Sequence, residues 1–180
     1  MDIVDALDQT FQHAQHVISG VRPDQLDNKT PCPEWTVRDL LEHQIGVVAG
    51  MGAAVAGEPR GEFKLSADPA NQFATVSAAA LAAWRAPGAL DRTINAGPGP
   101  MPGQVLAGIN LLDTATHTWD VAIATGQPAE LPDAVAEAAL EASHTIVSAE
   151  LRAGRFGPEV AAPKGAAATE RLVAFLGRTP

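Results

Sequence analysis

The segment from Gln104 to Thr125 constrains the fold more than any other part of the chain. One stripe of residues recurs along it at steps of three and four, as on the buried face of a helix: Val105, Ile109, Leu112, Thr116, Trp119 and Ile123. The adjacent stripe carries Asp113, His117 and Asp120. A carboxylate or an imidazole that faces an apolar core is unfavourable unless a partner neutralises it. The segment therefore predicts a buried helix with a polar site built into it, and Gly126 as its C-cap.

The same spacing recurs along most of the chain. It predicts further helices over residues 4–20, 37–56, 69–86, 132–151 and 170–176. Strand alternation is nearly absent: residues 92–95 are expected to form a short extended piece, and 97–103 a rigid, proline-rich loop. Four long helices with shorter additions predict an all-α fold, a four-helix bundle that forms one domain over residues 1–180.

Composition and charge narrow the class of protein. The chain has 180 residues, 46% of them hydrophobic and 18% charged, which is a globular composition. Its net charge is −9 and no Lys/Arg cluster appears, so neither a nucleic-acid surface nor binding to an anionic membrane is expected. The N-terminus lacks a signal-peptide pattern and no apolar stretch reaches transmembrane length. These features predict a soluble cytoplasmic protein.

His43, Asp113 and His117 are the strongest candidate site. Asp113 and His117 are four residues apart and share one helix face, and His43 would come from the 37–56 helix. Two imidazoles and a carboxylate suit zinc, nickel, iron or manganese and leave a coordination position open, as a catalytic site requires. The spacing supports equally an alternative without a metal, in which Asp113 and His117 only hydrogen-bond each other.

Asp120 has several possible roles next to this trio. It would serve as a ligand in place of Asp113, as an acceptor for an imidazole N–H, or as the general base that deprotonates a bound thiol or water. A structural aspartate hydrogen-bonded to a loop backbone is the alternative. We select Asp120 as the candidate catalytic residue.

The remaining chemically notable residues are expected to be structural. Cys32, the single cysteine, allows no disulfide within the chain and no zinc–thiolate site, and is expected to be a small buried hydrophobe rather than a nucleophile. His144 is expected to lie in the core or at an interface, and Trp35 and Trp119 to be core anchors. No phosphate loop, dinucleotide fingerprint or nucleophile elbow is present in the sequence.

Four short motifs resemble those of a known family. The chain reads TPCPEWTVRDLLEH over residues 30–43, DTATHTWD over 113–120 with ATG at 124–126, FGP over 156–158 and LVAFLGR over 172–178. These motifs resemble those of an actinobacterial family of metal-binding proteins. That family is related to the N-terminal domain of mycothiol-dependent maleylpyruvate isomerase and to the wider DinB/YfiT superfamily. The resemblance spans nearly the whole chain.

The resemblance implies a DinB-like four-helix bundle that holds a divalent metal. The metal would be bound by a histidine of the second helix and by an acid-x-x-x-histidine pair, at positions that match His43, Asp113 and His117. Zinc is the first expectation, with nickel or iron as alternatives. The isomerase has glutamate where this chain has Asp113, whose side chain is one methylene shorter.

The resemblance also implies a function. Relatives include thiol transferases in which the metal activates the thiol of mycothiol or bacillithiol. The chain is thus expected to be a metal-dependent transferase or isomerase, a monomer or a homodimer, acting on a mycothiol-like small-molecule thiol and an electrophilic substrate. The alternatives are a non-catalytic metal- or small-molecule-binding module of the same fold and a family member without a metal.

Overall fold

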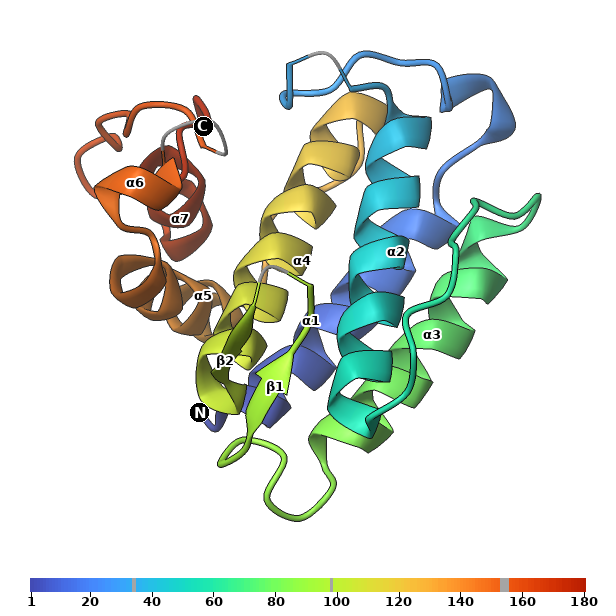
Figure 1. Ribbon diagram of the computed structural model, residues 1–180. Helices are drawn as coiled ribbons and strands as arrows, with labels where there is room; N and C mark the ends of the chain where they lie inside the picture. Colours follow the sequence, from blue (N-terminus) through green and yellow to red (C-terminus); the bar gives the residue numbers. More distant parts are fainter. Residues whose placement is uncertain (34, 98, 153–155) are drawn as a thin grey trace.

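Four helices form the bundle of the computed structural model, which describes residues 1–33, 35–97, 99–152 and 156–180 (Figure 1). They are α1 (Ile3–Ser19), α2 (Val37–Ala56), α3 (Pro69–Trp84) and α4 (Gly103–Thr125). α1 and α2 each pack against both α3 and α4, so their buried faces enclose one apolar core. The predicted all-α bundle and the positions of these helices are confirmed.

A second, smaller group of helices covers the outer side of α4. α5 (Asp133–Ile146) packs against α4, and α7 (Ala168–Phe175) packs against α5, with the short α6 (Ala149–Arg152) beside it (Figure 1). A 3₁₀ turn (Pro23–Gln25) follows α1. The C-terminal segment therefore lies next to the helix that carries the candidate site, although it is distant from that helix in sequence.

Two sequence predictions need correction. A single helix over residues 132–151 is wrong near its C-terminal end: α5 stops at Ile146, Val147 leaves the helical region, and the Ser148 hydroxyl accepts a hydrogen bond from the Leu151 N–H at 3.2 Å, which starts α6. The loop over 97–103 is partly wrong, because β2 (Pro100–Pro102) pairs antiparallel with β1 (Thr93–Asn95). Pro98, within that loop, lies outside the described residues.

The start of α2 is fixed by a capping box. The Thr36 hydroxyl accepts from the Asp39 N–H at 3.3 Å, and the Asp39 carboxylate accepts from the Thr36 N–H at 2.9 Å. Deeper in the same helix, the fully buried Gln44 donates to the Thr114 carbonyl at 3.1 Å and to the Thr118 hydroxyl at 2.8 Å. These contacts set the register of α2 against α4 beside His43.

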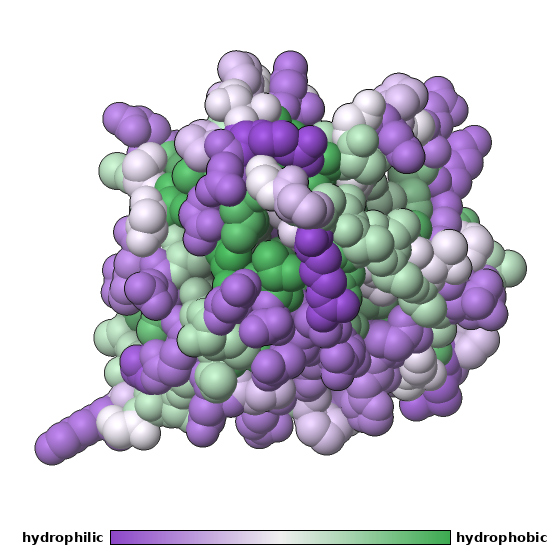
Figure 2. Space-filling view, turned by 90° about the horizontal axis from the view of Figure 1, so that it is seen from below, coloured by the Kyte–Doolittle hydropathy of each residue, from purple (hydrophilic) through white to green (hydrophobic). Residues whose placement is uncertain are grey.

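One end of the bundle exposes both apolar and hydrophilic side chains. Figure 2 shows the end at which α4 begins, with apolar side chains at its centre and hydrophilic ones around them. Within the described residues, no helix has both the length and the apolarity needed to cross a membrane.

Gly52 marks the closest approach of α2 to α3. A Cβ atom at this position would lie 2.8 Å from both Cα and Cβ of Ala80, and neither atom can move without moving α3. Gly52→Ala is expected to lower the free energy of unfolding by about 1–3 kcal/mol through overpacking. Urea unfolding measures this change. Gly50→Ala is the matched control, because its Cβ meets only the flexible Arg60 side chain; a loss as large at Gly50 would contradict the explanation.

Candidate metal centre

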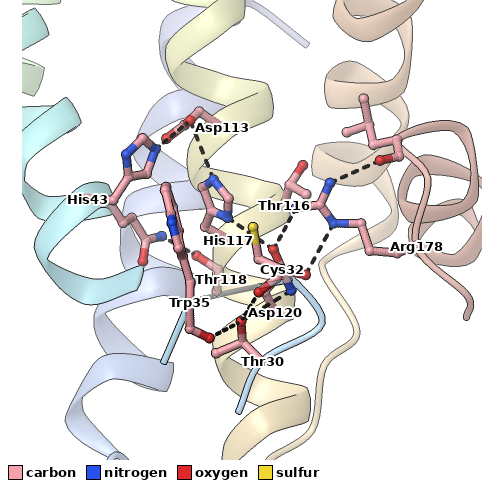
Figure 3. Close-up of polar contacts among 12 residues, drawn as sticks. Thr30, Cys32, Trp35, His43, Asp113, Thr116, His117, Thr118, Asp120 and Arg178 are labelled. Carbon is pink, nitrogen blue, oxygen red and sulfur yellow. Dashed lines mark hydrogen bonds and ion pairs between the residues drawn. The ribbon is translucent and has the colours of Figure 1, made fainter. Parts of the chain in front are cut away.

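His43, Asp113 and His117 meet between α2 and α4, as Figure 3 shows. His43 projects from α2, and the other two project from α4. One ligand atom from each residue lies within 4.8 Å of the others, and the side chains are 33%, 19% and 11% exposed. A divalent cation that takes one atom from each residue needs this spacing, together with access from one side. The sequence-predicted trio is brought together as two imidazoles and one carboxylate, a set that fits a divalent metal site.

The hydrogen bonding of Asp113 fits a metal site. Its Oδ1 lies 3.2 Å from His43 Nε2 but 3.7 Å from His117 Nε2, which is too long for a hydrogen bond. Its Oδ2 is buried and has no hydrogen-bond partner among the described residues. A buried carboxylate oxygen without a partner is unfavourable, and a cation would satisfy it. The alternative in which Asp113 and His117 merely bond each other does not match these distances.

Burial and the two nearby histidines shift the pKa of the Asp113 carboxyl in opposite directions. Burial alone raises the pKa of its carboxyl, but the electrostatic attraction of the nearby His117 and the hydrogen bond from His43 outweigh it and hold the pKa below its ordinary value. Asp113 is therefore a carboxylate at neutral pH. It has the charge state that a metal ligand requires.

Asp120 lies behind His117 and orients its ring. His117 Nδ1 is 3.0 Å from Asp120 Oδ2, and since a carboxylate only accepts, Nδ1 carries the proton. In the neutral ring Nε2 then has a free lone pair, and this nitrogen is the one that faces Asp113 and His43. Such a carboxylate–histidine pair is a common support for a metal ligand.

Arg178 holds Asp120 in place from the C-terminal segment. Its Nε and Nη2 donate to the two oxygens of Asp120 at 3.2 and 2.8 Å, and its Nη1 donates to the Leu176 carbonyl at 2.9 Å. Gly177, at φ +85°, turns the chain after α7 and passes so close to the Gly157 backbone that a Cβ would not fit. Both oxygens of Asp120 are thus occupied, which favours the predicted supporting role over that of a general base. The catalytic assignment of Asp120 remains a prediction.

The loop before α2 supplies a residue with an unexpected position. The sequence predicts Trp35 as a core anchor, but its partly buried ring lies 4.7 Å from the His43 ring and 5.9 Å from the His117 ring. The Thr30 hydroxyl, 2.9 Å from the Trp35 carbonyl, helps to fix this loop. Glu34, part of the quoted motif, lies outside the described residues. Trp35 therefore forms a wall of the site.

A cavity of about 600 Å³ opens onto the cluster. All three candidate ligands line it, together with Arg178 and Trp35. Its remaining wall is largely apolar and comes from five parts of the chain: Pro31, Ile109, Leu112, Ile146, Leu151 and Phe156. The volume lies within the range of small-molecule sites. The cluster is open to a ligand rather than sealed inside the bundle.

The other notable side chains have different surroundings. Cys32 is partly buried in the wall of the cavity, where burial raises the pKa of its thiol and keeps it protonated. The prediction of a core position for His144 is wrong: its side chain is exposed, and its ring meets the Phe175 ring edge-on at 4.4 Å. Trp119 is buried in the core as expected. Neither His144 nor Trp119 lines the cavity.

Protonation of Asp120 at low pH is expected to lower the free energy of unfolding of the metal-free protein. Burial alone raises the pKa of this carboxyl, but hydrogen bonds from His117 and Arg178 outweigh it and keep the pKa below its ordinary value. Because the pKa of Asp120 is lower in the folded protein than in the unfolded chain, where it is about 4, its ionised form stabilises the fold above pH 4. This stabilisation is lost as the pH falls from about 4 through the folded-state pKa. In urea unfolding, we expect Asp120→Asn to show a shallower loss of stability below about pH 4 than wild type. The difference should not exceed about 1.4 kcal/mol per pH unit. The exposed Asp91→Asn is the control; an unchanged slope in Asp120→Asn would contradict this account.

Comparisons with known proteins agree with this architecture. Residues 7–122 match the family model of the mycothiol maleylpyruvate isomerase N-terminal domain. Uncharacterized proteins from two strains of Mycobacterium tuberculosis are each 38% identical over 170 residues, covering 91% of this chain and 90% of the relative. The crystal structure of the mycothiol-dependent maleylpyruvate isomerase superposes with a TM-score of 0.52 at 16% identity, covering 77% of this chain and 68% of that chain. This chain belongs to the family of the mycothiol maleylpyruvate isomerase N-terminal domain.

Proposed function

We propose that this protein is a divalent-metal-dependent enzyme that activates a mycothiol-like thiol for attack on an electrophilic substrate. The observation that carries the proposal is the cavity of about 600 Å³ that reaches His43, Asp113 and His117 together. A metal with a purely structural role needs no such access, whereas a catalytic metal needs an open position. Family membership supports the thiol, and zinc is the metal we expect.

Each residue of the site would have a separate role in this reaction. His43, Asp113 and His117 would hold the metal, which lowers the pKa of a thiol that coordinates it. Asp120 and Arg178 keep the proton of His117 on Nδ1 and leave Nε2 free to bind. His43 Nε2 donates to Asp113 while no metal is present and would lose that proton when it binds one. Trp35 and the apolar wall border the cluster on the side of the cavity and would position a substrate there.

The first test is metal content. Protein purified without an affinity tag should contain about one equivalent of metal by elemental analysis, and His117→Ala should contain much less. Trp35 gives an independent optical signal, because its ring lies 4.7 Å from the His43 ring and 5.9 Å from the His117 ring, so a paramagnetic ion such as Co²⁺ held by these histidines would quench its fluorescence. Trp35→Phe should then bind the ion without this quenching. Equal metal in wild type and His117→Ala would overturn the site.

The second test separates an enzyme from a binding module. Addition of mycothiol to the Co²⁺-loaded protein should produce a thiolate-to-cobalt absorption band. Thiol transfer to an electrophile such as monobromobimane should then exceed the rate without protein and disappear in His117→Ala. Metal and thiol binding without such turnover across a panel of electrophiles would favour the non-catalytic module.

A further inference from the structure

We propose that the cavity beside the cluster receives an uncharged, apolar group, so that the electrophile is an apolar molecule rather than a carboxylate such as maleylpyruvate. This inference rests on the proposed function and specifies the substrate for it. The apolar wall is built from separate elements: Ile109 and Leu112 of α4, Ile146 at the end of α5, Leu151 of α6, and Phe156. The break between α5 and α6 brings Leu151 into this wall.

Among the described residues, the polar side chains at the cavity offer little to a substrate carboxylate. Arg178 is the only lysine or arginine among the described residues that line it. Its side chain is 8% exposed, and three of its nitrogens already donate to Asp120 or to the Leu176 carbonyl. The Thr116 hydroxyl is also engaged, since it donates to the Leu112 carbonyl at 2.6 Å. The arginine charge is therefore balanced by the Asp120 carboxylate.

A second cavity borders the same two aromatic rings but has a charged lining, so the apolar lining is particular to the first cavity. It has a volume of about 610 Å³ and also touches Trp35 and His43, but charged side chains line it, namely Asp39, Glu42 and Arg60. The indole of Trp35 and the ring of His43 thus border a polar space and an apolar one. We assign the thiol carrier to the charged space, whose side chains can hydrogen-bond to it. The apolar space remains for the other substrate.

Alkyl hydroxamates test the inference by binding alone. They coordinate a metal through their head group, so their tails report on the space beside it. With Co²⁺-loaded protein, we expect the affinity to rise about threefold to fourfold per methylene from acetohydroxamate towards octanohydroxamate. The monohydroxamate of succinic acid, which carries a charged tail, should bind no better than acetohydroxamate. The readout is the cobalt absorption spectrum during titration.

Two variants test whether the rise in affinity with chain length arises in this cavity. Ile109→Arg and Leu151→Glu introduce opposite charges into separate parts of the apolar wall, and each should abolish the gain with chain length. Ile109→Arg should in addition improve binding of the succinic monohydroxamate. Ile123→Arg is the control on the same helix, because Ile123 is 47% exposed and lies outside the cavity.

The outcomes separate this inference from the proposed function. Affinity that is independent of chain length, a preference of wild type for the carboxylated tail, or failure of every hydroxamate to bind the metal-loaded protein would overturn the apolar-substrate inference. A metal-binding site could survive any of these results. Absence of stoichiometric metal in the tag-free protein would instead overturn the proposed function itself.

Discussion

Replacing Arg178 by methionine is expected to lower the free energy of unfolding by about 3–5 kcal/mol. Arg178 and Asp120 form a buried pair, with side chains 8% and 0% exposed and two hydrogen bonds of 3.2 and 2.8 Å. Methionine keeps much of the side-chain volume but leaves the Asp120 carboxylate buried with only His117 as its partner. The cost of the unpaired charge is the source of the loss. Urea unfolding of the metal-free protein at neutral pH measures it.

Two further variants isolate the role of the pair. The double variant Arg178→Met/Asp120→Leu should recover most of the loss, because removing both charges removes the uncompensated one. Arg171→Met is the surface control: the ion pair of Arg171 with Glu137 is exposed, and such pairs contribute less than about 1 kcal/mol. An Arg178→Met loss no larger than that of Arg171→Met would contradict the account.

The sequence predicts local structure well because its signals are local. The bounds of α2 match the prediction because Thr36 caps the start of the helix and Gly57, in the left-handed region, ends it. The sequence does not indicate the break at Val147, because the apolar spacing continues across it, while Ser148 starts a new turn. The hairpin of β1 and β2 has only three residues in each strand, too few to show an alternating pattern.

The site could be predicted in part for the same reason. Asp113 and His117 are one turn apart, so their common face follows from helix geometry alone. His43 joins them only through the packing of α2 on α4, and its place in a family motif pointed to it. Arg178 reaches Asp120 across 58 residues of sequence, and no local pattern indicates that contact. The closing motif around Arg178 was the one available signal, and it did not specify a partner.

Substitutions in and around the cluster are expected to lower metal affinity in a fixed order. Asp113→Ala removes a proposed ligand and should have the largest effect, more than the roughly 100-fold upper range for loss of a supporting carboxylate. Asp120→Asn keeps all three ligands but weakens the orientation of His117, and the loss of such a supporting carboxylate typically lowers affinity 10- to 100-fold. Glu42→Gln is the control, since the exposed Glu42 is next to His43 in sequence but not in the cluster. Competition with a chelator, read by Trp35 quenching with Co²⁺, measures each dissociation constant.

Asp113→Glu separates the effect of the carboxylate's position on metal affinity from the effect of its negative charge. The longer side chain keeps the negative charge, but Asp113 Oδ1 is already 3.2 Å from His43 Nε2, so the added methylene must move the carboxylate within a packed site. We expect Asp113→Glu to retain one equivalent of metal with an affinity between those of wild type and Asp113→Ala. Asp113→Asn, which keeps the length and removes the charge, should bind more weakly than Asp113→Glu. The opposite order would mean that the position of the oxygen matters more than its charge, and an Asp113→Ala variant with unchanged affinity would remove Asp113 from the ligand set.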